Sequence, residues 1–111
     1  MTFLDTCIWI ELLGVHTPTK QHEILQARAA SNLLNTILEE DEQIITCEEQ
    51  LLEIINAIQK VTMRTVNRER KQQQLSGVSN LKEFRQLQEF DATKELCKSV
   101  IEDVKHFAKI N

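Results

Sequence analysis

The sequence predicts an α/β fold in which a small parallel sheet is outweighed by helices. Two short apolar segments, 2–5 and 43–46, each lead directly into a helical pattern, and further helical patterns separate them. Strands that are separated by helices in this way usually pair in parallel. The chain also has only two glycines and one proline in 111 residues, too few for the many tight turns of a β-sandwich or barrel.

Length and composition indicate a single domain over residues 1–111. Hydrophobic residues make up 41% of the chain and charged residues 27%, which suits a folded core and not a disordered chain. No apolar run approaches the ~20 residues that span a bilayer, and no secretory signal pattern begins the chain. The three cysteines, Cys7, Cys47 and Cys97, match no zinc motif. They are typical of free thiols, so we expect a cytoplasmic protein with no membrane partner.

The first part of the chain is expected to form a strand and two helices. We predict a strand over 2–5, followed by Thr6 as the N-cap of a short helix over 7–13. The Thr-Pro pair at 17–18 is typical of a helix entry. The helix that it begins should stop near Glu40, because the acidic run there is unfavourable at a helix C-terminus.

The second part is expected to repeat the pattern of strand, helix and helix. We predict a strand over 43–46, with Thr46 as N-cap and Glu49 three residues later completing a capping box. The helix that follows has apolar residues at spacings of three and four and continues towards Leu75. After a break over 76–79, the helical pattern runs to the end of the chain.

Two acids follow the two predicted strands. Asp5 lies where the first strand ends, and Glu53 lies inside the helix that follows the second. If the strands pair in parallel, both carboxylates lie above the edge at which open parallel sheets bind ligands. Such oxygen ligands suit Mg²⁺ or Mn²⁺, ions that activate water and screen phosphate charge. Taken singly, Asp5 is also explained as an ordinary helix-start acid and Glu53 as part of a solvated face.

The two segments that carry these acids resemble a known family. Residues 3–13, Phe-Leu-Asp-Thr-Cys-Ile-Trp-Ile-Glu-Leu-Leu, resemble the opening of PIN-domain nucleases. Residues 44–54, Ile-Ile-Thr-Cys-Glu-Glu-Gln-Leu-Leu-Glu-Ile, resemble their second block. The resemblance implies a PIN-like fold and a Mg²⁺-dependent ribonuclease, with Asp5 and Glu53 as catalytic, metal-binding acids. It also implies kinship with the toxins of bacterial toxin–antitoxin pairs, hence RNA as substrate and an antitoxin protein or a second copy as candidate partners.

The third and fourth acids of that family have no clear counterpart in this sequence. Asp103 begins an Asp-x-x-His-Phe stretch that echoes the family's late block, but residues 96–107 fit a helix better than a strand and turn. Asp91 is the other candidate, and charged helical residues are usually just solvated. A fragment, a natural truncation and a degenerate member of the family are all compatible with this pattern.

A basic stripe provides a candidate nucleic-acid contact. Its members, Lys60, Arg64, Arg68 and Lys71, are spaced by three or four residues and share one helical face. Such a stripe suits a phosphate backbone. The competing interpretation is a solvated face that balances the acidic run 39–42. The net charge of −4 does not indicate nucleic-acid binding, but it is compatible with a local basic patch.

The sequence therefore predicts a Mg²⁺- or Mn²⁺-dependent endoribonuclease of PIN type, plausible as a toxin. One alternative is a catalytically incomplete PIN-derived domain that binds protein or RNA, and another is a helical scaffold protein. Three or four acids around one point would favour the enzyme, and two acids facing solvent would favour the binding domain. Unpaired strands would favour the scaffold.

Overall fold

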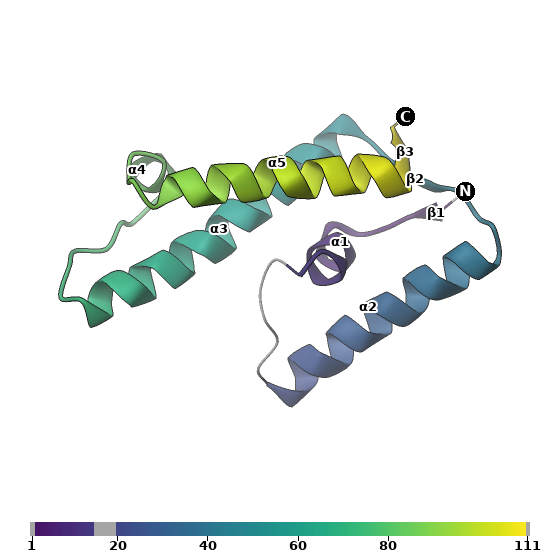
Figure 1. Cartoon of the computed structure of the whole chain (residues 1–111), viewed down its shortest axis with the longest axis horizontal. Coiled ribbons are helices and arrows are strands. Elements are labelled where there is room, and N and C mark those ends of the chain that lie inside the picture. The colour runs from purple at the N-terminus through teal and green to yellow at the C-terminus, as the bar shows by residue number, and fades with distance from the viewer. Residues whose placement is uncertain (1, 15–19, 111) are drawn as a thin grey trace.

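The computed structural model describes residues 2–14 and 20–110. These residues form three short strands and five helices, with two helices between the first two strands and three between the last two. They are β1 (Thr2–Phe3), α1 (Thr6–Leu12), α2 (Gln21–Glu39), β2 (Ile44–Thr46), α3 (Glu48–Gln72), α4 (Leu81–Phe84), α5 (Phe90–Phe107) and β3 (Ala108–Ile110). Figure 1 shows a very small sheet at one end of the molecule, from which the long helices α2, α3 and α5 extend. The predicted α/β class, with helices dominant, is confirmed.

The sheet is parallel throughout, with the strand order β1-β2-β3. Thr2 pairs with Ile44 and Phe3 pairs with Ile45, so the two predicted strands lie side by side in the predicted direction. On its other side β2 pairs with β3, where Ile44 faces Ala108. Because all three strands run the same way, α1 and α3 both begin at the carboxyl edge of the sheet. Separated strands would have favoured the scaffold alternative, and the observed pairing removes that support.

The third strand was not predicted from the sequence, which indicated helix to the end of the chain. Instead α5 ends at Phe107, and Ala108–Ile110 turn into an extended segment against β2. Three residues are too short to show a strand's alternating pattern. This strand is defined by its partner, because β-propensity depends mainly on neighbours across the sheet.

Several predicted boundaries and caps are also wrong. The strands are shorter than 2–5 and 43–46, and the N-cap of α1 is Asp5, not Thr6. The N-cap of α3 is Cys47, so Thr46 and Glu49 do not form a capping box. The Thr46 hydroxyl is buried and donates to a core glutamine, an option that local spacing does not reveal. The expected helix entry at 17–18 lies outside the described residues.

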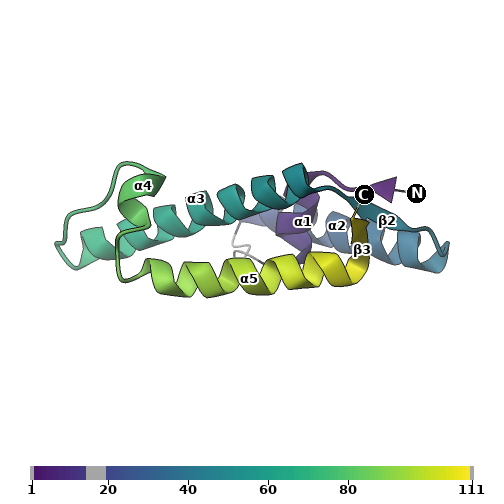
Figure 2. The same cartoon turned by 90° about the horizontal axis from the view of Figure 1, so that it is seen from above.

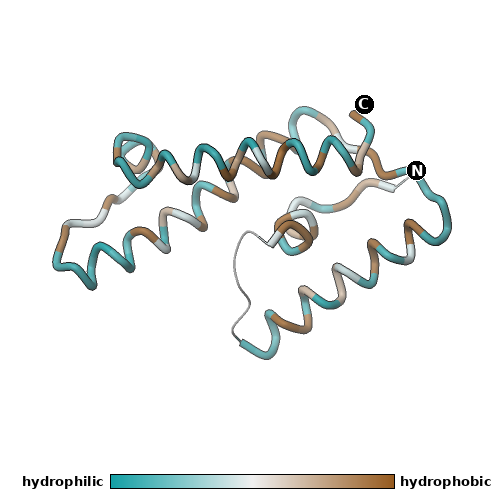
Figure 3. Tube along the Cα trace, viewed as in Figure 1, coloured by the Kyte–Doolittle hydropathy of each residue, from teal (hydrophilic) through white to brown (hydrophobic). Residues whose placement is uncertain are grey.

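The core lies where α1, α3 and α5 meet the sheet. Its members are the buried residues Leu4, Trp9, Ile10, Ile37, Ile44, Ile54, Ile58, Cys97, Val100, Val104 and Ala108. Helix α2 packs on α1 and buries only Ala30 and Ile37, leaving Leu25 and Leu38 about half exposed. The hydropathy colouring in Figure 3 shows apolar residues concentrated near the sheet and a largely hydrophilic far end of α3.

Helices α3 and α5 run side by side in opposite directions, and α4 closes their far end (Figure 2). At that end Arg70 donates to Glu89 across 2.7 Å. This hydrogen bond lowers the pKa of Glu89 from its usual range. The tie is therefore present at neutral pH and is lost as the pH falls through the lowered pKa. The long α3–α5 pair is held at both ends, by the core near the sheet and by this contact at the far end.

Candidate functional site

The carboxyl edge of the sheet brings the two predicted acids to neighbouring elements. Strand β1 leads through Leu4 into Asp5, which caps α1, and β2 leads through Cys47 into α3, which carries Glu53. Both carboxylates are on exposed residues. Asp5 makes no side-chain cap hydrogen bond, so its carboxylate is not used to begin α1. The parallel pairing of β1 and β2 therefore places both acids at one edge.

A direct hydrogen bond connects the two halves of the site. The Thr6 hydroxyl donates to Glu53 Oε2 at 2.8 Å, across 47 positions of sequence. Thr6 immediately follows Asp5, so Glu53 lies beside the α1 N-terminus that Asp5 caps. The bond occupies Oε2 and leaves Oε1 as the second oxygen of the Glu53 carboxylate. Thr6 was predicted only as a helix cap, and its contact with Glu53 was missed because no local pattern links residues 47 positions apart.

A buried polar link lies beneath the acids. Gln50 and Thr46 are only 2% and 1% exposed, and the Thr46 hydroxyl donates to Gln50 Oε1 at 2.6 Å. The Gln50 amide in turn donates to the Leu4 carbonyl, the last group before Asp5. Sequence analysis did not single out Gln50. Its spacing of four from Thr46 was the available signal, but that spacing is equally typical of an ordinary helix face.

No third acid joins Asp5 and Glu53 in the part of the chain that the structure describes. In that part, no group of three or more His, Cys, Asp or Glu side chains is placed to hold a metal ion. Asp91 and Asp103 are both exposed on α5. By the criterion set from the sequence, two exposed acids without a third favour the binding-domain alternative.

The donor set nevertheless fits a hard cation. Mg²⁺ keeps several of its waters and is typically bound by one or two carboxylates together with substrate phosphates. Asp5 and Glu53 are exposed carboxylates on neighbouring elements, linked through the Thr6 hydroxyl. Softer ligands are not required for Mg²⁺ or Mn²⁺. The pair is therefore a chemically suitable partial shell that a phosphate-bearing substrate would complete.

The basic stripe lies on the same face of α3 as Glu53. Steps of seven, eleven and eighteen residues place Lys60, Arg64 and Lys71 within about 20° of Glu53 around the helix axis. Arg68 lies about 60° away on the same side. All four cations are exposed, and within the ranges 2–14 and 20–110 none of them forms an ion pair. The four cations therefore extend over ~16 Å of helix, and the first of them, Lys60, lies ~10 Å along the helix axis from Glu53.

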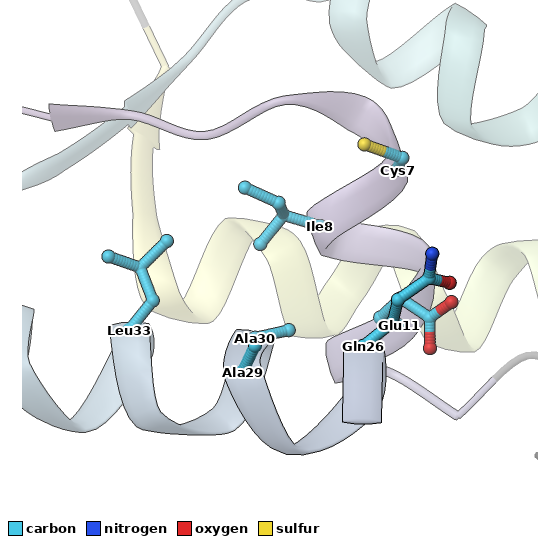
Figure 4. A pocket seen from close by; sticks show the side chains of 7 residues that line it. All are labelled: Cys7, Ile8, Glu11, Gln26, Ala29, Ala30 and Leu33. Atoms are coloured by element: carbon cyan, nitrogen blue, oxygen red, sulfur yellow. The ribbon is translucent and has the colours of Figure 1, made fainter. Parts of the chain in front are cut away.

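An open apolar groove of about 350 Å³ lies between α1 and α2. Figure 4 shows Ile8 of α1 and Leu33 of α2 on its walls, with Cys7 and Glu11 at its rim. The Cys7 thiol is free and exposed. The groove has no carboxylate pair and lies away from the basic stripe of α3, so it is a candidate contact surface and not part of the acid site.

None of the described helices combines the length and the apolarity that crossing a bilayer requires. The chain was also compared with protein-family models, curated proteins and solved structures. No family model, curated protein or solved structure matches it.

Proposed function

We propose that this protein is a metal-dependent endoribonuclease in which Asp5 and Glu53 hold Mg²⁺ or Mn²⁺. The observation that carries the proposal is the 2.8 Å hydrogen bond from the Thr6 hydroxyl to Glu53. It ties the second acid to the residue that follows the first, at the carboxyl edge of a parallel sheet, where such folds bind ligands. The resemblance of 3–13 and 44–54 to PIN-domain nucleases supports the same assignment.

The chain's own residues divide the work of such a site. Asp5 and Glu53 supply negative oxygen ligands, and Thr6 orients the Glu53 carboxylate by occupying one of its oxygens. A divalent cation bound there supplies a water of lowered pKa and neutralises charge on the scissile phosphate. The stripe of Lys60, Arg64, Arg68 and Lys71 attracts the phosphates that follow along the RNA. Cleavage is thus assigned to the junction of α1 and α3, and substrate binding to the face of α3 that carries Glu53.

RNA is the proposed substrate, and the free thiols fit the proposed cytoplasmic location. A toxin role, with an antitoxin protein as partner or a second copy of the chain, follows from the family resemblance alone. The apolar groove between α1 and α2 is a suitable surface for a protein partner of either kind.

The experiment that tests the proposed function is RNA cleavage by the purified chain. We expect cleavage in Mg²⁺ or Mn²⁺, its loss on chelation with EDTA, and its return when the metal is added in excess. Cleavage that persists unchanged in EDTA would contradict the proposal, and so would intact RNA under every divalent ion tested.

The basic stripe gives a prediction that separates binding from chemistry. Changing Arg64 and Arg68 to Gln removes two positive charges and preserves helix propensity. If both contact phosphates, RNA affinity should fall, and the slope of log affinity against log salt should shrink by about 1–2 units. RNA binding at several salt concentrations, in Ca²⁺ to suppress cleavage, measures this slope.

The matched control for the stripe is the change of Lys94 and Lys98 to Gln. These exposed lysines lie on α5, so this variant removes the same charge from another helix. A slope that shrinks equally in both variants would mean that overall charge, not the stripe, controls binding. An unchanged slope in the Arg64 and Arg68 variant would make the stripe a solvated face.

The second candidate function is a PIN-derived domain that binds RNA or protein without cleaving. The absence of a third acid beside Asp5 and Glu53 among the described residues is the observation that favours it. This candidate predicts RNA binding that depends on the basic stripe, with no product under any metal. The cleavage and binding assays together therefore distinguish the two functions.

A further inference from the structure

The Gln50 side chain forms a buried bridge between the ends of two strands. Gln50 is the third residue of α3, and its amide oxygen accepts from the Thr46 hydroxyl at 2.6 Å. Its amide nitrogen donates to the carbonyl of Leu4. Thr46 ends β2, and Leu4 follows β1. Because buried polar groups require partners, the three groups satisfy one another in one arrangement.

The chemistry of the two partners fixes how the amide is turned. A backbone carbonyl only accepts, so the Gln50 amide must present its nitrogen to Leu4 and its oxygen to Thr46. The peptide group is planar, so holding the Leu4 carbonyl also holds the plane of the bond that leads into Asp5. The amide of Gln50 therefore sets the orientation in which the chain enters Asp5.

The same residue is rigidly connected to the second acid. Glu53 lies three residues after Gln50, less than one turn along α3. The other tie between the two halves, from Thr6 to Glu53, is exposed and competes with water. The Gln50 bridge is shielded from that competition, since the side chain is only 2% exposed. The buried bridge, more than the exposed one, should therefore fix the spacing of the acids.

We propose that Gln50 is a positioning residue for the metal site: its buried amide holds the Leu4–Asp5 peptide against α3 and thereby sets the placement of Asp5 relative to Glu53. The inference rests on the proposed metal-dependent function. It assigns Gln50 no contact with the cation or the substrate. Removing a group that orients metal ligands without touching the metal commonly lowers metal affinity by about 10–100-fold.

The test measures Mn²⁺ affinity directly, by electron paramagnetic resonance of the free ion in titrations of the whole chain. Gln50→Met keeps the length of the side chain but removes both hydrogen bonds, and we expect Mn²⁺ affinity to fall by about 10–100-fold.

Gln59→Met is the matched control. Gln59 is also a buried glutamine of α3, and it accepts from Arg85 at 2.8 and 3.1 Å, away from the acids. The Gln59→Met variant should have a lower melting temperature than the wild type and the same Mn²⁺ affinity.

A second pair of variants covers the case in which Gln50→Met does not fold. Thr46→Val keeps the side-chain volume but removes the hydroxyl that orients the Gln50 amide, whereas Thr46→Ser keeps the hydroxyl. We expect Thr46→Val to weaken Mn²⁺ binding and Thr46→Ser to bind like the wild type. Equal Mn²⁺ affinity of Thr46→Val and Thr46→Ser would overturn the inference. A folded Gln50→Met variant that binds Mn²⁺ like the wild type would also overturn it.

Asp5→Asn separates failure of this inference from failure of the proposed function. If Asp5→Asn loses Mn²⁺ while folded Gln50→Met keeps it, only the positioning role is overturned. If the wild type and Asp5→Asn bind Mn²⁺ equally, or neither binds it, the metal site itself is wrong, and the role of Gln50 fails with it.

Discussion

Asp5→Asn is expected to reduce metal-dependent RNA cleavage by about 10²–10³-fold or more, because a bound metal contributes several kcal/mol of transition-state stabilisation. Asparagine has nearly the same shape as aspartate but lacks the charge that holds a divalent cation. The Asp5 side chain is exposed and makes no cap hydrogen bond, so the free energy of unfolding should change by less than about 0.5 kcal/mol. Cleavage rates of both proteins at one fixed Mg²⁺ concentration, chosen to saturate the wild type, together with thermal unfolding, measure both quantities.

The matched control is Asp91→Asn. Asp91 is also an exposed acid near the start of a helix, and it lies in the first turn of α5. This variant should cleave like the wild type, which separates a specific loss from a general effect of charge. Undiminished cleavage by folded Asp5→Asn, or an equal loss in both variants, would contradict the role given to Asp5.

A large loss of stability is expected from Ile58→Ala, which should lower the free energy of unfolding by about 2–5 kcal/mol. Ile58 is a fully buried residue of α3 and belongs to the main hydrophobic core, so the smaller side chain leaves a cavity. Leu52→Ala is the control on the same helix, because Leu52 is 62% exposed. That variant should change stability by no more than about 0.5 kcal/mol. Urea denaturation of both variants gives the comparison.

A similar loss for Leu52→Ala and Ile58→Ala would contradict the burial pattern of α3. It would mean that Leu52 is covered by a partner in solution or that the core is arranged differently. Dependence of the Leu52→Ala effect on protein concentration would identify the first of these, since association makes stability depend on concentration.

Much of the fold followed from short local signals in the sequence. The segments at Thr2 and Ile44 were both predicted as strands, and parallel pairing was predicted because helices separate them. The register of Thr2 with Ile44 confirms that pairing. The length of α3 followed from apolar residues at spacings of three and four, of which Ile54 and Ile58 are fully buried. Periodicity over many turns is a strong signal, and the prediction of α3 depended on it.

The parts that were missed depend on contacts between distant residues. Strand β3 has three residues and is defined by pairing with β2. Thr46 was assigned a local cap, but its hydroxyl is buried and bonds Gln50, whose amide reaches Leu4 across 46 positions. A capping box and a core hydrogen bond both begin from the same Thr, so local spacing could not choose between them.

The candidate site was predicted only in part, because some of its contacts also join residues that are distant in the sequence. The positions of Asp5 and Glu53 at one sheet edge follow from where the strands end, which the sequence indicates. The hydrogen bond from Thr6 to Glu53 does not, because it depends on how α1 packs against α3. No local pattern specifies the relative rotation of two helices that lie far apart in the chain.

The location of bound Mn²⁺ tests the central claim most directly. Mn²⁺ is paramagnetic and broadens the NMR signals of nuclei close to it, so a titration of the isotopically labelled chain locates the ion. The account predicts that small amounts of Mn²⁺ first remove the amide signals around Asp5, Thr6 and Glu53, while the signals of Asp91 and its neighbours on α5 persist. Broadening that centres on the acidic run 39–42, or that spreads evenly over all exposed acids, would contradict a metal site at the acid pair.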